Sequence, residues 1–237
     1  VPMSSHFVES VKNSFHYCEK IVKESGTNFY FGMLLTPPPK REAVYAIYAW
    51  MREIDDIADS IESLHVRHQR LIHYFRKTRS ILQNSSSLEK LQDKHWLAFY
   101  KTVRDYNIPL RYFREMVVGQ LHVIHKKPIR KFEDLYRYCY RVASTVGLIL
   151  IHIWGYRGGQ HTEKMAEYRG IAFQLTNILR DLRLDEEIGM NYIPEDMRQR
   201  KSLKELMEYS PKMLDEIISN LTHKAQEYFT LSSPLEK

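Results

Sequence analysis

The chain has 237 residues, of which 43% are hydrophobic, and this length suits one helical domain with a substantial core or two small domains. Its 35 Lys and Arg exceed its 29 Asp and Glu, so the formal net charge is +6, a balance that fits ordinary solubility, anionic substrates or anionic lipid headgroups. Nucleic acid would be compatible with this charge, but no nucleic-acid motif is present, and we expect no nucleic-acid partner.

Cysteine content and composition indicate the compartment. The two cysteines, Cys18 and Cys139, form neither a disulfide framework nor a CxxC metal pattern, which fits a reducing cytoplasm. The N-terminal residues lack the apolar core of a signal peptide, and the most apolar run, Val142–Gly155, is too short to span a bilayer. No Gly-, Ser- or Pro-rich linker divides the chain, so we expect one cytoplasmic domain over residues 1–237.

The N-terminal part predicts a helix, a polar turn and a second helix start. Residues 7–24 have helical apolar spacing, and a glycine follows them. Ser25, Thr27 and Asn28 then offer hydroxyl and amide groups directly before an aromatic run. Taken alone, these polar residues indicate an ordinary helix cap. Three prolines at 37–39 precede the next helix, because proline is tolerated in a first helical turn.

The stretch 45–59 predicts an amphipathic helix with an acidic end. Asp55 lies four residues after Met51 and points the same way, and Asp59 is one turn further along. Two carboxylates on the buried side of a helix are costly unless they are paired or bind a cation, although such pairs also occur as solvated surface charge. Arg52 is placed either to pair with Asp55 or to clamp a phosphate. The apolar positions of the helix are Val44, Ile47, Tyr48, Met51 and Ile54.

The middle of the chain is mainly structural. Residues 62–104 predict two amphipathic helices around a serine-rich turn at 85–87, and residues 110–124 predict another helix. The basic loop at 126–131 is typical of solvated charge, with lipid contact as the weaker alternative. A shared helical face in the next segment indicates core packing and consists of Tyr138, Val142, Thr145 and Ile149.

A second acidic stretch, residues 174–185, carries a polar ladder. Asn177, Asp181 and Asp185 lie at i, i+4 and i+8 on one helix face, with Gln174 close to the same face. An apolar stripe beside the ladder would pack into the body, and small residues beneath the ladder suggest the wall of a cavity. Two helices that offer only oxygen ligands suit Mg²⁺ or Mn²⁺ rather than zinc or copper. Magnesium held in this way usually completes its shell with substrate phosphates.

Two further elements complete the chain. The turn Gly189–Pro194 ends the acidic helix, and residues 210–229 have the spacing of a last amphipathic helix. Residues 186–202 carry mixed charge and, by this interpretation, few apolar anchors. Such segments open at low cost, so we expect this one to order when a ligand binds.

Four motifs in this order resemble the squalene/phytoene synthase family: SGTNFYFG from Ser25, RxxDDxxD at Arg52–Asp59, YRVASTVG at Tyr140–Gly147 and NxxRDxxxD at Asn177–Asp185. The resemblance implies an all-α isoprenoid synthase fold, a single helical bundle around a central apolar cavity, with further helices after the last residue. It also implies a prenyltransferase that joins two identical prenyl diphosphates, farnesyl or geranylgeranyl, head to head. The reaction would depend on Mg²⁺, pass through a cyclopropyl diphosphate and supply squalene, hopanoid or carotenoid precursors.

The resemblance implies a role for each candidate residue. The metal ligands would be Asp55, Asp59, Asn177, Asp181 and Asp185. The diphosphate would be bound by Tyr48, Arg52, Gln174 and Arg180, and by the loop residues Ser25, Thr27 and Asn28. The hydrocarbon pocket would be lined by Phe29, Met33, Val142 and Val146. The implied catalytic set is Tyr48, Arg52, Asp55, Asp59, Tyr138 and Asp181, with the Tyr138 hydroxyl directed at the site.

Two positions depart from the family pattern. Val123 stands where many members have an aspartate, and Met190 stands where they usually have an arginine. Each departure removes one polar group that relatives use near substrate or metal.

Two alternatives stay open at this stage. Another Mg²⁺-dependent prenyltransferase or a terpene cyclase would use similar acids, but the YRVASTVG and NxxRDxxxD segments argue against it. A non-catalytic scaffolding protein of the same fold would tend to lose the acids, whereas this chain keeps them. The sequence does not distinguish C15 from C20 substrates, use of NADPH from its absence, or one oligomeric state from another. Peripheral association with the inner face of the membrane is compatible with it.

Overall fold

The computed structural model describes residues 5–25, 33–84 and 94–236, and the regular structure within these ranges is entirely helical. The chain forms two compact units. The N-terminal unit comprises Val1–Val117 and His152–Gly155, and the C-terminal unit comprises Val118–Ile151 and Tyr156–Lys237. Two helices, α6 and α8, contribute residues to both units. Among the described residues, no helix combines the length and apolar character that crossing a membrane requires.

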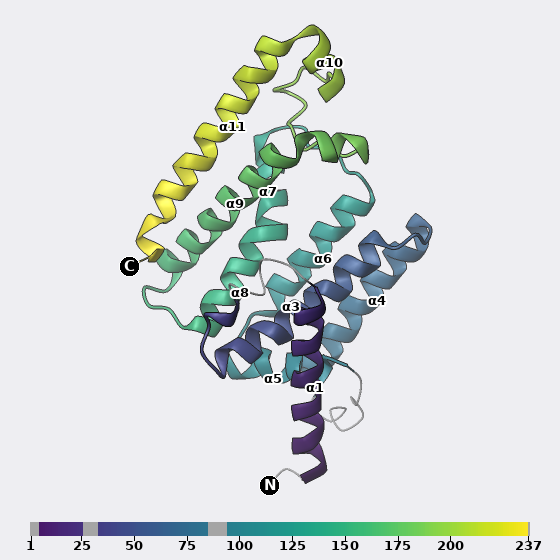
Figure 1. Ribbon diagram of the computed structural model, residues 1–237, viewed down its shortest axis with the longest axis vertical. Helices are drawn as coiled ribbons and strands as arrows, with labels where there is room; N and C mark the ends of the chain where they lie inside the picture. The colour runs from purple at the N-terminus through teal and green to yellow at the C-terminus, as the bar shows by residue number, and fades with distance from the viewer. Residues whose placement is uncertain (1–4, 26–32, 85–93, 237) are drawn as a thin grey trace. The chain divides into compact units, whose positions relative to one another are not determined.

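The N-terminal unit is built around α3, which starts directly after Pro39 and is buried on most sides (Figure 1). Trp50 lies at its centre, fully buried, stacked on Phe99 with ring centroids 5.6 Å apart and edge-on to Phe113 at 5.0 Å. Its indole nitrogen donates to Thr78 Oγ1 at 3.0 Å, which satisfies the only polar atom of that side chain. The helices of this unit are α1 (Ser5–Glu24), α3 (Lys40–Asp59), α4 (Leu64–Gln83), α5 (Trp96–Asp105) and the start of α6 (Leu110–Ile124).

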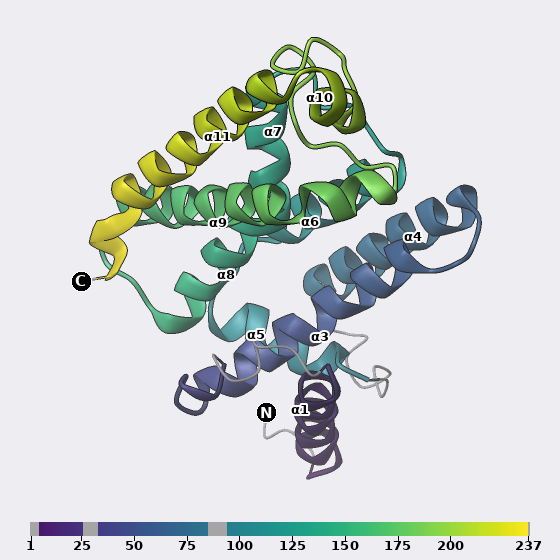
Figure 2. The same ribbon diagram turned by 45° about the horizontal axis from the view of Figure 1, so that its top comes forward.

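The C-terminal unit is organised around α9, which runs side by side with α11 in both views (Figures 1 and 2). The inward face of α9 consists of Ile171, Leu175 and Ile178, all buried with the apolar residues of α11 in one core. The elements of this unit are α7 (Phe132–Cys139), a π-helical turn η2 (Tyr140–Ser144), most of α8 (Thr145–Trp154), α9 (Gln160–Glu187), α10 (Leu203–Tyr209), α11 (Pro211–Ser232) and η3 (Ser233–Glu236).

A close approach between α9 and η2 explains the small residues on α9. A Cβ added to Gly170 would lie 2.4 Å from Ser144 Cα and 2.5 Å from Ser144 N, so no side chain fits there. The Ser144 hydroxyl donates to the Glu167 carbonyl at 2.7 Å and ties the two elements together. The space beneath Gly170, which the sequence suggested as cavity wall, is therefore filled by backbone.

Most of the predicted helices are confirmed. The predictions at residues 7–24, 110–124, 174–185 and 210–229 correspond to α1, α6, the second half of α9 and α11. Two helices cover the predicted range 62–104, and the serine-rich turn between them lies outside the described residues. The segment that carries the predicted shared face is not one regular helix, because η2 separates α7 from α8. The short helix α10 was not predicted.

The prediction of few apolar anchors in residues 186–202 is wrong. Met190, Tyr192 and Ile193 are buried in the core of the C-terminal unit. The Glu195 amide also donates to the Ile129 carbonyl at 2.9 Å, which joins the segment to the loop before α7. An aromatic and two aliphatic side chains thus hold this segment, so these residues oppose the low opening cost that a ligand-dependent lid needs.

Candidate active site

The first acidic motif occupies the last two turns of α3. Asp55 is half-buried, whereas Asp59 is the last residue of the helix and exposed, so the prediction that both carboxylates leave the buried side holds for Asp55 only. The last turn contains no basic residue. Acidic side chains at the negative end of the helix dipole are unfavourable, and a cation there relieves this repulsion.

The carboxyl group of Asp55 is affected by burial and by the neighbouring acids. Its pKa is raised to about 6, first by burial and next by the negative charge of Asp59, with a smaller contribution from Asp56 and an opposing one from Arg52. The group is therefore partly protonated near pH 6. A divalent cation would favour the ionised form and displace that proton.

Arg52 lies beside the acids and pairs with a residue that the sequence interpretation did not select. Its Nη2 lies 2.8 Å from Asp56 Oδ1, and both side chains are about half exposed. The ion pair considered from the sequence was with Asp55. In the structure Arg52 forms an ion pair with Asp56, and its charge also opposes the rise in the pKa of Asp55. Asp56 thus positions the guanidinium, and its i, i+4 spacing from Arg52 is the sequence signal that could have identified it.

The other candidates of the N-terminal unit lie near α1. Met33 and Tyr48 are half-buried and pack against a cluster formed by α1, α3 and α5. The Ser25 hydroxyl donates to the Val22 carbonyl at 2.7 Å, which satisfies the C-terminal end of α1. Three predicted site residues lie outside the described residues: Thr27, Asn28 and Phe29.

The second acidic motif carries a bidentate ion pair on α9. Arg180 donates from Nε to Asp181 Oδ1 at 2.8 Å and from Nη2 to Oδ2 at 2.6 Å. These bonds lower the pKa of the Asp181 carboxyl, whereas burial and the charge of Asp181 raise the pKa of Asp185. Gln174 and Asn177 are half-buried on the same helix. The motif therefore holds one carboxylate fixed in its ionised form beside a second that a cation would stabilise.

Tyr138 meets a residue that the sequence interpretation missed. Its hydroxyl donates to the Tyr192 hydroxyl at 3.0 Å, and the two rings stack with centroids 4.7 Å apart. Burial, followed by the neighbouring Tyr192, raises the pKa of Tyr138 well above the usual tyrosine range, and the charge of Asp185 adds to this. The pair is thus neutral and within electrostatic reach of the second acidic motif. The only sequence signal for Tyr192 was an aromatic residue in the turn after the acidic helix.

The candidate hydrocarbon-pocket residues of the C-terminal unit lie at the π-helical turn. Val142 is within η2, and Val146 is in the first turn of α8, and both are half-buried. Gly119 allows α6 to pack closely against η2, because a Cβ at Gly119 would lie 2.9 Å from Val142 Cγ1. Single π-helical turns within α-helices occur often at functional sites.

The two acidic motifs belong to different units, so their convergence on one cavity remains a prediction. Within the described ranges, no three or more Asp, Glu, His or Cys side chains are grouped closely enough to hold a metal ion. Mg²⁺ held by one or two carboxylates usually completes its shell with waters and substrate phosphates. Each unit brings together an acidic helix and an adjacent arginine.

The described fold is that of the isoprenoid synthases. The chain superposes on a dehydrosqualene synthase with a TM-score of 0.75 and 25% identity, covering 95% of this chain and 78% of that one. Squalene synthase HpnC from Alicyclobacillus acidocaldarius gives a TM-score of 0.84 at 22% identity, with coverage of 100% and 86%. This likeness confirms the predicted all-α fold.

Sequence comparison identifies the family. Residues 22–235 match squalene/phytoene synthase. The 15-cis-phytoene synthase of Synechocystis is 33% identical over 202 residues, which are 80% of this chain and 58% of that protein. The chloroplastic phytoene synthase of Narcissus pseudonarcissus is 29% identical over 96% of this chain and 54% of its own length. The chain belongs to the squalene/phytoene synthase family, and it spans a little over half the length of these relatives.

Proposed function

We propose that the protein is a prenyltransferase that condenses two identical prenyl diphosphates, farnesyl or geranylgeranyl, head to head and with Mg²⁺. The observation that supports this most is the pair of acidic helix segments, each with an arginine held by a neighbouring aspartate, in a chain of this family. Relatives named phytoene synthase and squalene synthase support the same reaction class.

The residues present fit the metal that this reaction would use. The donors are carboxylate and amide oxygens, which suit Mg²⁺, with Mn²⁺ as a substitute. Burial, and next the charge of Asp59, raises the pKa of Asp55, and a divalent ion would favour the ionised carboxylate against both effects. When bound, Mg²⁺ would neutralise the diphosphate and make it a better leaving group. The proposed ligands are Asp55, Asp59, Asn177, Asp181 and Asp185.

Two arginines would bind the departing diphosphate. Arg180 is already aligned by Asp181, and Arg52 by Asp56. A guanidinium matches two phosphate oxygens at once, so each arginine would exchange its aspartate for the diphosphate. Asp181 would then be free to ligate metal. Tyr48 and Gln174 would complete the diphosphate contacts.

The first half-reaction converts two allylic diphosphates into one cyclopropyl diphosphate. The C1–O bond of one substrate breaks, and the C2–C3 double bond of the other attacks the resulting allylic cation. Loss of a proton closes the three-membered ring. Half-buried apolar side chains such as Met33, Val142 and Val146 would exclude water from the cation. The Tyr138 and Tyr192 hydroxyls, which are neutral, would offer dipoles to the allylic cation and would add no formal charge beside it.

The setting of the reaction follows from its product. A C30 or C40 product is insoluble in water, so we propose a cytoplasmic enzyme that works beside the membrane that receives it. A reductive final step with NADPH would give squalene, and its omission would give phytoene or dehydrosqualene.

Product analysis of the full-length protein tests the proposal. We expect C30 or C40 products, or the cyclopropyl diphosphate, from farnesyl or geranylgeranyl diphosphate with Mg²⁺, measured by mass spectrometry with and without NADPH. EDTA, Asp59→Asn or Asp181→Asn should abolish them. Cyclised products from single substrates would identify a terpene cyclase. Substrate binding without turnover would support the scaffolding alternative.

A further inference from the structure

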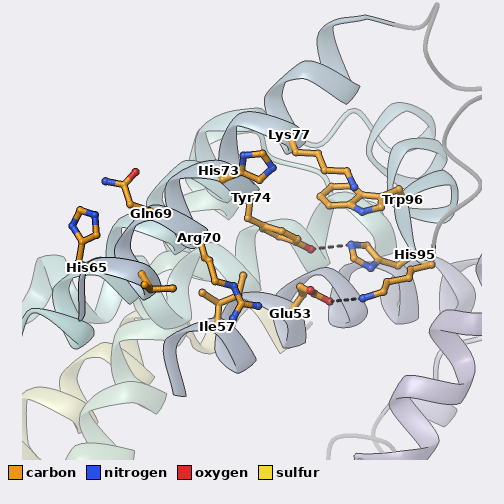
Figure 3. A pocket seen from close by; sticks show the side chains of 12 residues that line it. Glu53, Ile57, His65, Gln69, Arg70, His73, Tyr74, Lys77, His95 and Trp96 are labelled. Atoms are coloured by element: carbon orange, nitrogen blue, oxygen red, sulfur yellow. Dashed lines mark hydrogen bonds and ion pairs between the residues drawn. The ribbon is translucent and has the colours of Figure 1, made fainter. Parts of the chain in front are cut away.

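A second concave site lies wholly within the N-terminal unit, between α3, α4 and the start of α5 (Figure 3). Its volume is about 680 Å³, within the usual range for small-molecule sites. Glu53 and Ile57 line it from α3. Residues two positions apart on a helix point in roughly opposite directions, so this face of α3 is turned away from Asp55. The pocket therefore lies on a different side of α3 from Asp55.

Positive charge dominates the lining of this pocket. Arg70, Lys77 and Lys94 contribute cations, and Glu53 contributes the one carboxylate among the lining residues. The helix α4 continues this bias, because its 20 residues contain five Arg or Lys and no Asp or Glu. A concave surface of one charge concentrates ions of the opposite sign. The expected ligand is an anion.

The cations differ in how far they are already neutralised. Arg70 forms an ion pair with Glu62, and Lys94 Nζ lies 3.8 Å from Glu53 Oε2. Lys77 Nζ lies 4.6 Å above the Trp96 ring, and no carboxylate of the described residues forms an ion pair with it. An aromatic face stabilises an ammonium group without cancelling its charge. Lys77 is therefore the cation with the greatest capacity to bind an added anion.

The floor of the pocket is rigid and carries no net charge. The Tyr74 hydroxyl is hydrogen-bonded to His95 Nε2 at 2.8 Å, and both side chains are buried. Burial, together with the charges of Lys77 and Lys94, lowers the pKa of His95 to about 3, so the ring is neutral. Figure 3 places Lys77, His95 and Trp96 at one end of the pocket. Cations beside an aromatic wall suit a phosphate attached to an apolar group.

We propose that this basic pocket binds a phosphate group, carried by a soluble phosphate compound or by a lipid headgroup, with Lys77 and Lys94 as its main ligands. The proposal does not depend on the condensation reaction, because its residues lie on the side of α3 away from Asp55, on α4, and at or directly before the start of α5. A lipid source is relevant because Ile61, in the turn between α3 and α4, and Leu64, the first residue of α4, are exposed apolar residues.

The test uses the full-length protein in a metal-free buffer that contains EDTA. Inorganic pyrophosphate is the soluble probe, measured by titration calorimetry, and phosphatidic acid vesicles are the lipid probe, measured by co-sedimentation. Without divalent ions the carboxylates of the acidic motifs repel both probes, and the comparison of variants assigns the binding that remains. We expect saturable binding of at least one probe, weakened by about tenfold or more in Lys77→Gln/Lys94→Gln, because charge-assisted contacts are lost.

A matched control removes the same charge elsewhere on α4. Arg76 and Arg79 are exposed and are not among the lining residues, so Arg76→Gln/Arg79→Gln should change affinity by no more than about twofold. Circular dichroism checks that both variants fold. Binding of pyrophosphate would identify a soluble phosphate, and binding of vesicles alone would identify a headgroup. Absence of binding by the unaltered protein, or equal weakening in both variants, would overturn the proposal and leave the condensation reaction unaffected.

Discussion

Gly170→Ala should destabilise the C-terminal unit because it forces apart α9 and η2. The new Cβ would lie 2.4 Å from Ser144 Cα, about 1 Å closer than ordinary contact. The obstructing atoms are backbone, so relief requires a shift of the whole element, at the upper end of the 1–3 kcal/mol that overpacking costs. Alanine regains about 1 kcal/mol of helix propensity. The net loss should be about 2 kcal/mol.

Gly147→Ala is the matched control. It lies in α8, directly after η2, and its Cβ would approach the Ala166 carbonyl oxygen of α9 at 3.4 Å, which is ordinary contact. The free energy of unfolding should therefore stay within about 1 kcal/mol of the unaltered protein. Urea unfolding followed by circular dichroism compares the two variants. A Gly170→Ala variant as stable as Gly147→Ala would refute the packing argument.

Three further predictions concern the acidic motifs and the tyrosine pair. The folded-state pKa of Asp55 is raised from 3.8 to about 6. Between pH 4 and 6 the folded protein therefore binds more protons than the unfolded chain, and its stability falls as the pH rises. Asp55→Asn should reduce this fall, measured as melting temperature against pH. Arg180→Gln should weaken binding of Mg²⁺-pyrophosphate by about tenfold in calorimetry, with little change in melting temperature because the ion pair is largely exposed. Tyr192→Phe should lower stability by about 1 kcal/mol through the lost hydroxyl contact with Tyr138, and combining it with Tyr138→Phe should cost less than the sum of the two in a double-mutant cycle.

The strongest sequence predictions came from periodicity. The ladder Asn177, Asp181 and Asp185 was placed on one helix because a spacing of four residues fixes a helical face. Asp59 was misplaced as buried, since periodicity does not show where a helix ends. Tyr192 was missed because its partner, Tyr138, is 54 residues away in sequence, and no local pattern records such a contact.

Local patterns also failed at the π-helical turn and at the basic pocket. The π-helical turn at Tyr140–Ser144 depends on packing of Ser144 against Gly170, which is a tertiary contact. The sequence analysis gave residues 62–104, which include α4, a structural role only. The pocket that the basic residues of α4 line also needs Lys94 and Trp96, which the fold brings beside them. The apolar anchors of residues 186–202 were missed because Met190, Tyr192 and Ile193 lie in a turn, where hydrophobic residues follow no characteristic period.

The central claim is that the two acidic motifs act on the same bound diphosphates. Calorimetric titration of the Mg²⁺-loaded protein with an unreactive farnesyl thiodiphosphate tests this most directly, using Asp59→Asn, Asp181→Asn and the combined variant. If the motifs share one site, each substitution should remove most of the binding free energy, and the combined variant should bind no more weakly than the weaker single variant. The claim would be contradicted if the losses of binding free energy in the two single variants summed to the loss in the combined variant. It would also be contradicted if either single variant kept a site of full affinity.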